Sequence, residues 1–203
     1  DKFSCNGSTV GIDFTATNSI PTFFTWTNNN SSIGLATSGI GNIPEFIATN
    51  NGTTPIVATI TVTPHRNLVD NFNCDGQSQT FTITVMPSTT INSVANQIVC
   101  PGTTINEIVF TGTIPGTIIE WTNNNPTIGL AANGTGNIPS FTATNVGYFE
   151  QFGVITVRTK IYAGLLNGIP IYCSGESFIF QISVKGNPEP PVITANGITN
   201  ICQ

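Results

Sequence analysis

Apolar and polar residues alternate over short runs along the whole chain, and turn residues separate these runs. Residues 58–62 (ATITV) and 81–85 (FTITV) have the two-residue period of a strand with one buried face. In the second half, the same reasoning predicts strands near 91–99, 104–112, 117–122, 127–131, 138–144, 152–162 and 177–185. Turns rich in Gly, Pro and Asn fall between them at intervals of about 8 to 12 residues, which is typical of a β-sandwich.

The chain also repeats itself. Residues 26–50 (WTNNNSSIGLATSGIGNIPEFIATN) return at 121–145 as WTNNNPTIGLAANGTGNIPSFTATN, with 18 of 25 positions identical. The offset of 95 holds through ATITV and GVITV. It then becomes 99, because the second copy has four extra residues before its next cysteine. We therefore expect two tandem modules, 1–87 and 88–187.

Pro87 follows the last strand of module one, and a proline-rich segment at 188–191 follows the last strand of module two. Both predict linkers at these places. The stretch that ends at Cys202 resembles the one that ends at Cys100, so residues 188–203 are expected to be a linker and the opening strand of a third module. By the same comparison, module one is expected to lack most of its first strand. The pattern is that of a segment from a longer array.

The order of strands within each module fits an immunoglobulin-like Greek key, so the predicted fold class is all-β. Trp26 and Trp121 lie on the third major strand, where such folds bury an aromatic anchor. We therefore interpret both as core residues. The glycines of the GxxxxGxG spacing, such as Gly34 and Gly39, are interpreted as sites of positive φ or of close backbone approach, because no Lys-Ser/Thr follows as in a phosphate loop.

Several motifs together resemble a known kind of repeat. They are the Cys-x-Gly turns at Cys5 and Cys100, the Trp strand, the block IGLAxxGxGNIPxFxATN, a long loop with Cys-x-Gly, and the closing FTITV. The chain is similar to the PKD-like, immunoglobulin-like modules of very large SprB-type gliding-motility surface adhesins of Bacteroidota. This resemblance implies type IX secretion, display on the bacterial cell surface outside the outer membrane, and a role in attachment during gliding. It brings no catalytic residues.

Composition narrows the choice of function. Only 7% of residues are charged, and the net charge is −5 with five basic residues in all. Such a chain offers little for phosphate backbones or anionic lipid to bind, and no stretch approaches 18 consecutive apolar residues, so we expect neither nucleic acid nor direct membrane insertion. One histidine, His65, without a nearby nucleophile gives little material for catalysis. We predict that the chain is not an enzyme and holds no cofactor.

A calcium site was considered in one loop. Asp70 and Asp75 lie there with two asparagines, and hard oxygens suit Ca²⁺, but a site needs six to eight of them. The equivalent loop of module two has lost both aspartates. No metal is therefore predicted.

Two runs of asparagine follow the tryptophan strands: Asn28, Asn29 and Asn30 in module one, and Asn123, Asn124 and Asn125 in module two. Asparagine closes turns through its side-chain hydrogen bonds, and this favours a turn role. The alternative is a polar patch that contacts a ligand or a neighbouring module.

The five cysteines follow the repeat. Cys5, Cys100 and Cys202 lie at the turn after a first strand, and Cys74 and Cys173 lie in the long loops 65–79 and 160–176. One scheme pairs Cys5 with Cys74 and Cys100 with Cys173 within modules, which requires those loops to fold back over strands about 20 Å long. The other pairs Cys5 with Cys173 across the junction. Both stay open, with a lean towards the first; Cys202 has no partner within these residues.

The leading hypothesis for function is a structural spacer in an adhesin stalk, whose partners are the neighbouring modules of the same chain. A module that itself binds a polysaccharide or another surface ligand is the alternative, and several exposed aromatic residues on one face would favour it. An accessory domain of a secreted enzyme is the third hypothesis.

Overall fold

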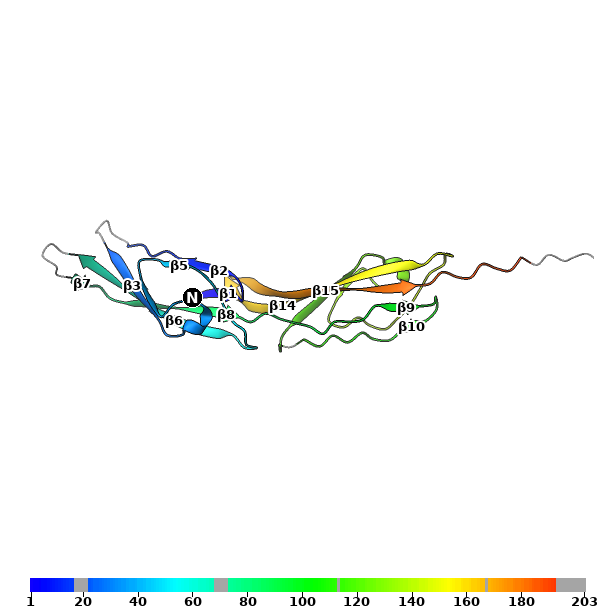
Figure 1. Ribbon diagram of the computed structural model, residues 1–203, viewed down its shortest axis with the longest axis horizontal. Coiled ribbons are helices and arrows are strands. Elements are labelled where there is room, and N and C mark those ends of the chain that lie inside the picture. Colours follow the sequence, from blue (N-terminus) through cyan, green and yellow to red (C-terminus); the bar gives the residue numbers. More distant parts are fainter. Residues whose placement is uncertain (17–21, 68–72, 113, 167, 193–203) are drawn as a thin grey trace, which may run out of the picture.

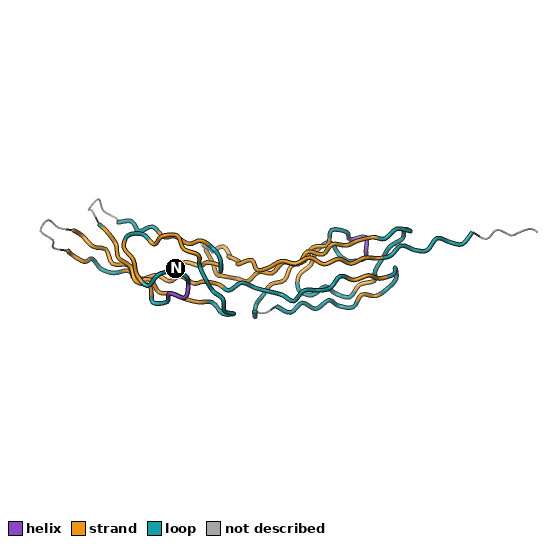
Figure 2. Tube along the Cα trace, in the orientation of Figure 1, coloured by secondary structure: helices purple, strands orange, loops and turns teal. Residues whose placement is uncertain are grey.

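The computed structural model describes residues 1–16, 22–67, 73–112, 114–166 and 168–192. Two β-sandwiches lie end to end along one axis, and a long hairpin of the second reaches the first (Figure 1). Strands and the loops between them account for nearly all of the described chain, and Figure 2 shows the only helical pieces of this part as short single turns. The prediction of an all-β chain of two tandem immunoglobulin-like sandwiches is therefore confirmed.

Module one has a large sheet and a small one. The large sheet has the order β1 (Lys2–Cys5), β8 (Gln79–Met86), β6 (Ile56–Asn67), β3 (Phe23–Asn28), β4 (Ser38–Ile40), and β7 (Asn73–Asp75) pairs with the far end of β6. The small sheet pairs β2 (Thr9–Ile12) with β5 (Ile43–Ile47). A 3-10 turn, η1 (Ser31–Ile33), follows β3. Strand β1 is parallel to β8, and the other pairs are antiparallel.

Module two repeats this plan. Its large sheet has the order β12 (Asn133–Thr135), β11 (Ile118–Asn123), β14 (Gln151–Leu166), β15 (Ile169–Val184), β9 (Gln97–Val99). Its small sheet pairs β10 (Thr104–Ile105) with β13 (Phe141–Thr142). The turn η2 (Pro126–Ile128) stands where a strand was expected at 127–131, because Asn125 caps a 3-10 turn there.

The first strands of the two modules occupy the same place in the large sheet. All four residues of β1 pair with Ile83 to Met86 of β8, while β9 in module two pairs three residues with β15. Residues 88–95 of module two precede the stretch that aligns with module one, and within them Ile91 makes one isolated bridge to Gly112. The expected opening strand of a third module lies mostly at 193–203, outside the described residues.

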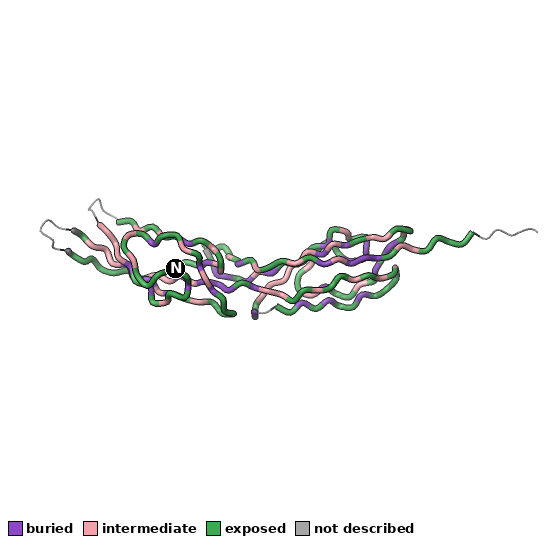
Figure 3. The backbone as a smooth tube through the Cα atoms, in the orientation of Figure 1, coloured by how far each residue is buried: buried purple, intermediate pink, exposed green. Residues whose placement is uncertain are grey.

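Each module encloses its own core, which Figure 3 shows as two separate buried regions. Inward-facing positions of the large sheet supply most of it, including Ile60, Ile83 and Val85 in module one and Ile155 and Val157 in module two. The alternation of these positions along ATITV and FTITV is the pattern from which the strands were predicted.

The packing of each tryptophan explains why one position of each repeat is a glycine. Trp26 and Trp121 are 3% exposed, and each pairs across the sheet with a glycine, Gly39 or Gly134. A Cβ on Gly134 would lie 2.2 Å from Cζ2 of Trp121. The indole therefore lies flat against glycine backbone, and the prediction of close approach or positive φ at these glycines is confirmed.

Replacing Gly134 by alanine should destabilise module two by about 1 to 3 kcal/mol, because the new methyl group displaces the indole of Trp121. Gly147→Ala is the matched control, since a Cβ there meets Oδ1 of Asn145 at 3.5 Å and the backbone N of Phe149 at 4.0 Å, both ordinary van der Waals contacts. Chemical denaturation of the two variants measures the difference. Equal losses would contradict the packing argument.

Candidate functional site: the junction between the modules

The feature that sets this molecule apart from two separate sandwiches is the hairpin of β14 and β15. Both strands have 16 residues, and they stay paired from Gln151 and Val184 to Leu166 and Ile169. Residues 160–176 were expected to be a long loop, and this was wrong. Residues 160–166 and 169–176 are instead paired strands that extend out of module two towards module one (Figure 1).

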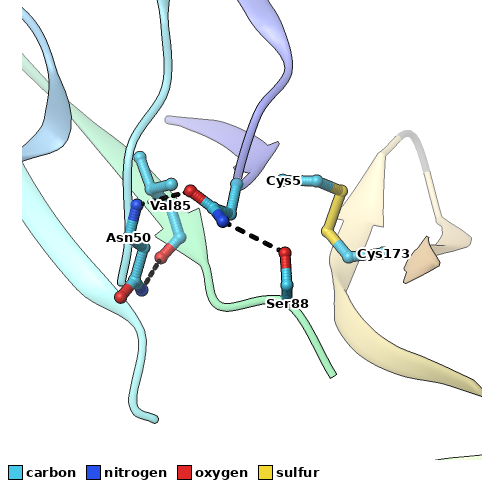
Figure 4. Close-up of a disulfide and its surroundings, with 6 residues drawn as sticks. Cys5, Asn50, Val85, Ser88 and Cys173 are labelled. Atoms are coloured by element: carbon cyan, nitrogen blue, oxygen red, sulfur yellow. Dashed lines mark hydrogen bonds between the residues drawn. A yellow bond between two sulfur atoms is a disulfide. The ribbon is translucent and has the colours of Figure 1, made fainter. Parts of the chain in front are cut away.

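A disulfide joins this hairpin to module one. Cys5 at the end of β1 bonds to Cys173 on β15, with 5.4 Å between the Cα atoms (Figure 4). Cys74 and Cys100 are free and exposed. Of the two schemes considered from the sequence, the bond across the junction is the one that forms, and the favoured pairing within modules is wrong. Cys202 lies outside the described residues.

Strand geometry explains why pairing within module one fails. Cys74 pairs with Arg66 on β6, while Cys5 lies beside Met86, next to the Val85–Ile56 pair at the other end of the sheet. Ten residues of β6 separate Ile56 from Arg66, which is roughly 33 Å in a strand. The segment around Cys74 is itself a strand paired to β6, so it does not fold back to close that distance.

A small apolar cluster surrounds the disulfide. Its buried members are Met86 from module one and Ile114, Ile161, Ala163 and Cys173 from module two, and Cys5 and Ile171 pack against them. Burying these side chains between the modules stabilises one fixed arrangement, because their apolar area is removed from water. Phe3 extends the contact, since its ring lies over the backbone of Gly164, where a Cβ would come within 2.8 Å.

The linker is fixed to the hairpin by hydrogen bonds. Thr89 is fully buried, its carbonyl accepts from the backbone N of Glu176 at 3.0 Å, and its hydroxyl donates to Oγ1 of Thr159 at 2.7 Å. A Cβ on Gly175 would lie 1.9 Å from Oγ1 of Thr89, so only glycine leaves room for the linker. On the other side, Asn6 Nδ2 donates to Oγ of Ser88 at 3.1 Å (Figure 4).

Glycine 175 therefore gives a test of the linker contact. We expect Gly175→Ala to loosen the junction and to leave both sandwiches folded, because the methyl group would overlap Thr89 and not the core of either module. Amide hydrogen exchange at Glu176 measures this, since its N–H is protected by the Thr89 carbonyl. Unchanged protection at Glu176 in the variant would contradict the assignment.

The asparagine runs serve the modules internally. The first asparagine of each run donates from Nδ2 into the segment after the 3-10 turn: Asn28 to the carbonyl of Leu35 at 3.1 Å, and Asn123 to that of Leu130 at 3.0 Å. Both side chains are buried. These bonds hold the turn against the end of the strand, which is the turn role considered from the sequence.

The second and third asparagines act on neighbouring strands and on the turn. Asn29 and Asn124 accept through Oδ1 from the backbone N of Thr59 at 2.7 Å and of Val154 at 2.8 Å. Asn30 and Asn125 accept through Oδ1 from the second residue of η1 and η2, at 3.2 Å in both modules. All six side chains thus have partners within their own module.

His65 lies at the end of module one that faces away from the junction. Its Nδ1 is 2.6 Å from Oδ1 of Asp75, its Nε2 is 2.7 Å from Oγ1 of Thr25, and its ring stacks on Phe23. Asp75 therefore contacts His65, and Asp70 lies outside the described residues. Within the described part of the chain, no group of three or more His, Cys, Asp or Glu is placed to hold a metal ion.

Comparison with known proteins gives little further guidance. No family model and no curated protein matches the chain. Among solved structures, it is similar to the EC1-2 segment of human protocadherin-24, at 10% identity and a TM-score of 0.35 over 85% of each chain. None of the described helices is long and apolar enough to cross a membrane.

Proposed function

We propose that the chain is a stiff stalk segment of an extracellular adhesin, in which each immunoglobulin-like module is fixed to the next. The observation that carries this proposal is the junction, where a disulfide, a buried apolar cluster and a hydrogen-bonded linker hold the two modules together. A spacer needs such a junction because a flexible linker would let the modules bend. A disulfide that persists also suits an exported protein.

The finer proposal is an SprB-type surface adhesin that is exported by the type IX route and acts in attachment during gliding. Its support is the repeat block at 26–50 and 121–145 and the closing strand motif. An antibody against this segment should label intact cells of the source organism, and loss of the gene should reduce attachment and gliding on a surface. Labelling only after cell lysis would overturn the surface assignment.

Stiffness can be tested directly in solution. In the oxidised chain, residual dipolar couplings from the two modules should fit one alignment tensor, and in a Cys5→Ser/Cys173→Ser variant the two tensors should diverge. Cys74→Ser/Cys100→Ser is the matched control, because it removes two exposed thiols and leaves the junction bond in place. Separate tensors in the oxidised chain would contradict a stiff stalk.

The alternative function is that the module binds a polysaccharide. Tyr162 and Tyr172 favour it, since both rings are exposed on the hairpin and meet edge to face with centroids 5.9 Å apart. The ammonium of Lys160 lies 4.9 Å from the centre of the Tyr172 ring. Screening against a polysaccharide array, with Tyr162→Ser/Tyr172→Ser as the control, distinguishes a binding module from a spacer.

A further inference from the structure

The outer end of module one has the same construction as the hairpin that module two uses to hold module one. Arg66 pairs with Cys74 as Ile161 pairs with Cys173. In both hairpins the pairing shifts by one residue at the same place, between Val62 and His65 in module one and between Arg158 and Lys160 in module two. Cys74 is therefore presented at its end of the molecule as Cys173 is presented at the junction.

A groove beside Cys74 marks the place where a linker would run. Pro64 and Gly76 line it together with His65, Arg66 and Asp75. Pro64 and Gly76 correspond in the repeat to Thr159 and Gly175, which are the two residues that Thr89 covers at the junction between the modules. The groove is thus at the position where module two binds the linker, with the ring of Pro64 lying beside Gly76 where Thr89 lies beside Gly175.

One residue in this end differs in charge from its counterpart. Ile161 is buried in the apolar cluster with Met86, while Arg66 in the same position is exposed. At the far end of module two, Lys185 follows Val184 as Met86 follows Val85, and it forms an ion pair with Glu150 at 2.9 Å. The two outer ends therefore each carry a cation where the inner junction buries an apolar side chain.

We propose that this end of module one docks another immunoglobulin-like repeat at its exit end, which is the end where its last strand passes into the linker. That repeat presents a cysteine to Cys74 and an acidic side chain to Arg66. The partner's linker occupies the groove over Pro64 and Gly76. The Cys74 bond forms by exchange with a small-molecule disulfide. The two protein thiols give up their protons and two electrons to it, and the small molecule is released as two thiols. This inference rests on the proposed stalk function and adds the chemistry that selects the neighbour.

Charge is the selecting element because docking removes water from Arg66. An acid opposite Arg66 offsets the loss of hydration, whereas a second cation leaves two like charges facing each other. Among the described residues, the other titratable groups beside Arg66 are His65 and Asp75, whose Nδ1 and Oδ1 lie 2.6 Å apart. The chain's own exit end offers Lys185, so copies of this chain should join end to end poorly, and module order in an array should be kept.

Two singly reactive forms of the full chain test this. The acceptor carries Cys100→Ser and Cys202→Ser, so that Cys74 is its free thiol. The donor carries Cys74→Ser and Cys202→Ser, so that Cys100 is its free thiol, together with Glu150→Gln, so that position 185 is the charge that varies. The measurement is the initial rate of donor–acceptor disulfide formation in a glutathione buffer at low salt.

The donor with Lys185→Glu should cross-link to the Arg66 acceptor about fivefold faster than the Lys185 donor, and added salt should reduce this gain. Arg66→Glu in the acceptor should reverse the preference, and Glu facing Glu should again be slow. Equal rates in all four combinations would overturn charge selection, and no specific cross-link in any of them would overturn the docking. Both of these results are independent of the alignment-tensor test, which measures the Cys5–Cys173 junction alone.

Discussion

Stretching the oxidised chain from its two ends should extend it by only roughly 100 Å, the length of the residues beyond Cys173. The disulfide joins Cys5 to Cys173 across a sequence separation of 168. Force applied at the termini passes through this bond, so the residues between the two cysteines carry no load. After reduction, the same pull should release roughly 570 Å more as both modules unfold.

Single-molecule force spectroscopy with handles at residues 1 and 203 measures these lengths with and without reductant. The Cys74→Ser/Cys100→Ser variant should behave as the unmodified chain, because its junction bond is intact. Cys5→Ser should give the long extension without reductant. An extension of several hundred Å in the oxidised chain would show that the bond does not bear the load.

This expectation gives the disulfide a mechanical role that a bond within one module would not have. A bond from Cys5 to Cys74 would shield one module and leave the linker under load. The observed bond shields the linker as well, because residues 87–90 lie inside the closed loop. Under tension the junction of a stalk is therefore protected at the place where two separate domains would first part.

The sequence allowed the two modules and the buried tryptophans to be predicted because these features are local. Alternation in ATITV and FTITV identifies paired strands, and the repeat identifies the modules. The turn roles of the first and third asparagine of each run also follow from short-range hydrogen bonds, whereas Asn29 and Asn124 accept from strands 30 residues away. Asn50 is different, because its Nδ2 reaches the carbonyl of Val85 at 2.8 Å, 35 residues away (Figure 4).

The junction was harder to predict because its apolar cluster combines Met86 and Cys5 of module one with residues of the module-two hairpin. Ala163 and Ile171 continue the strand pattern past the end of their own core, and both fall in the predicted loop 160–176, whereas Ile161 falls in the predicted strand 152–162 as well. One signal was present: Asn167-Gly168 lies between two apolar runs, and Asn-Gly favours a tight hairpin turn. Given that turn, a continuous strand pair follows, and Cys173 is placed far from Cys100.

Replacing a core tryptophan should cost module stability more than any surface change in the same module. Trp26→Ala and Trp121→Ala should each lower the free energy of unfolding by about 3 to 5 kcal/mol, because a large buried side chain leaves a cavity that the sheets fill only in part. Both indoles are 3% exposed and pack flat on glycine. Denaturant unfolding of each variant, followed by a probe in the affected module, gives the loss.

Phenylalanine at the same positions provides the matched control. Among the described residues, neither Nε1 of Trp26 nor Nε1 of Trp121 has a hydrogen-bond partner. Trp→Phe therefore removes a buried N–H that makes no bond, and this gain offsets part of the lost volume. We expect the phenylalanine variants to lose less than half as much stability as the alanine variants. A loss below about 1 kcal/mol for Trp121→Ala would contradict its role as a core anchor and would favour an indole free to stack on a sugar.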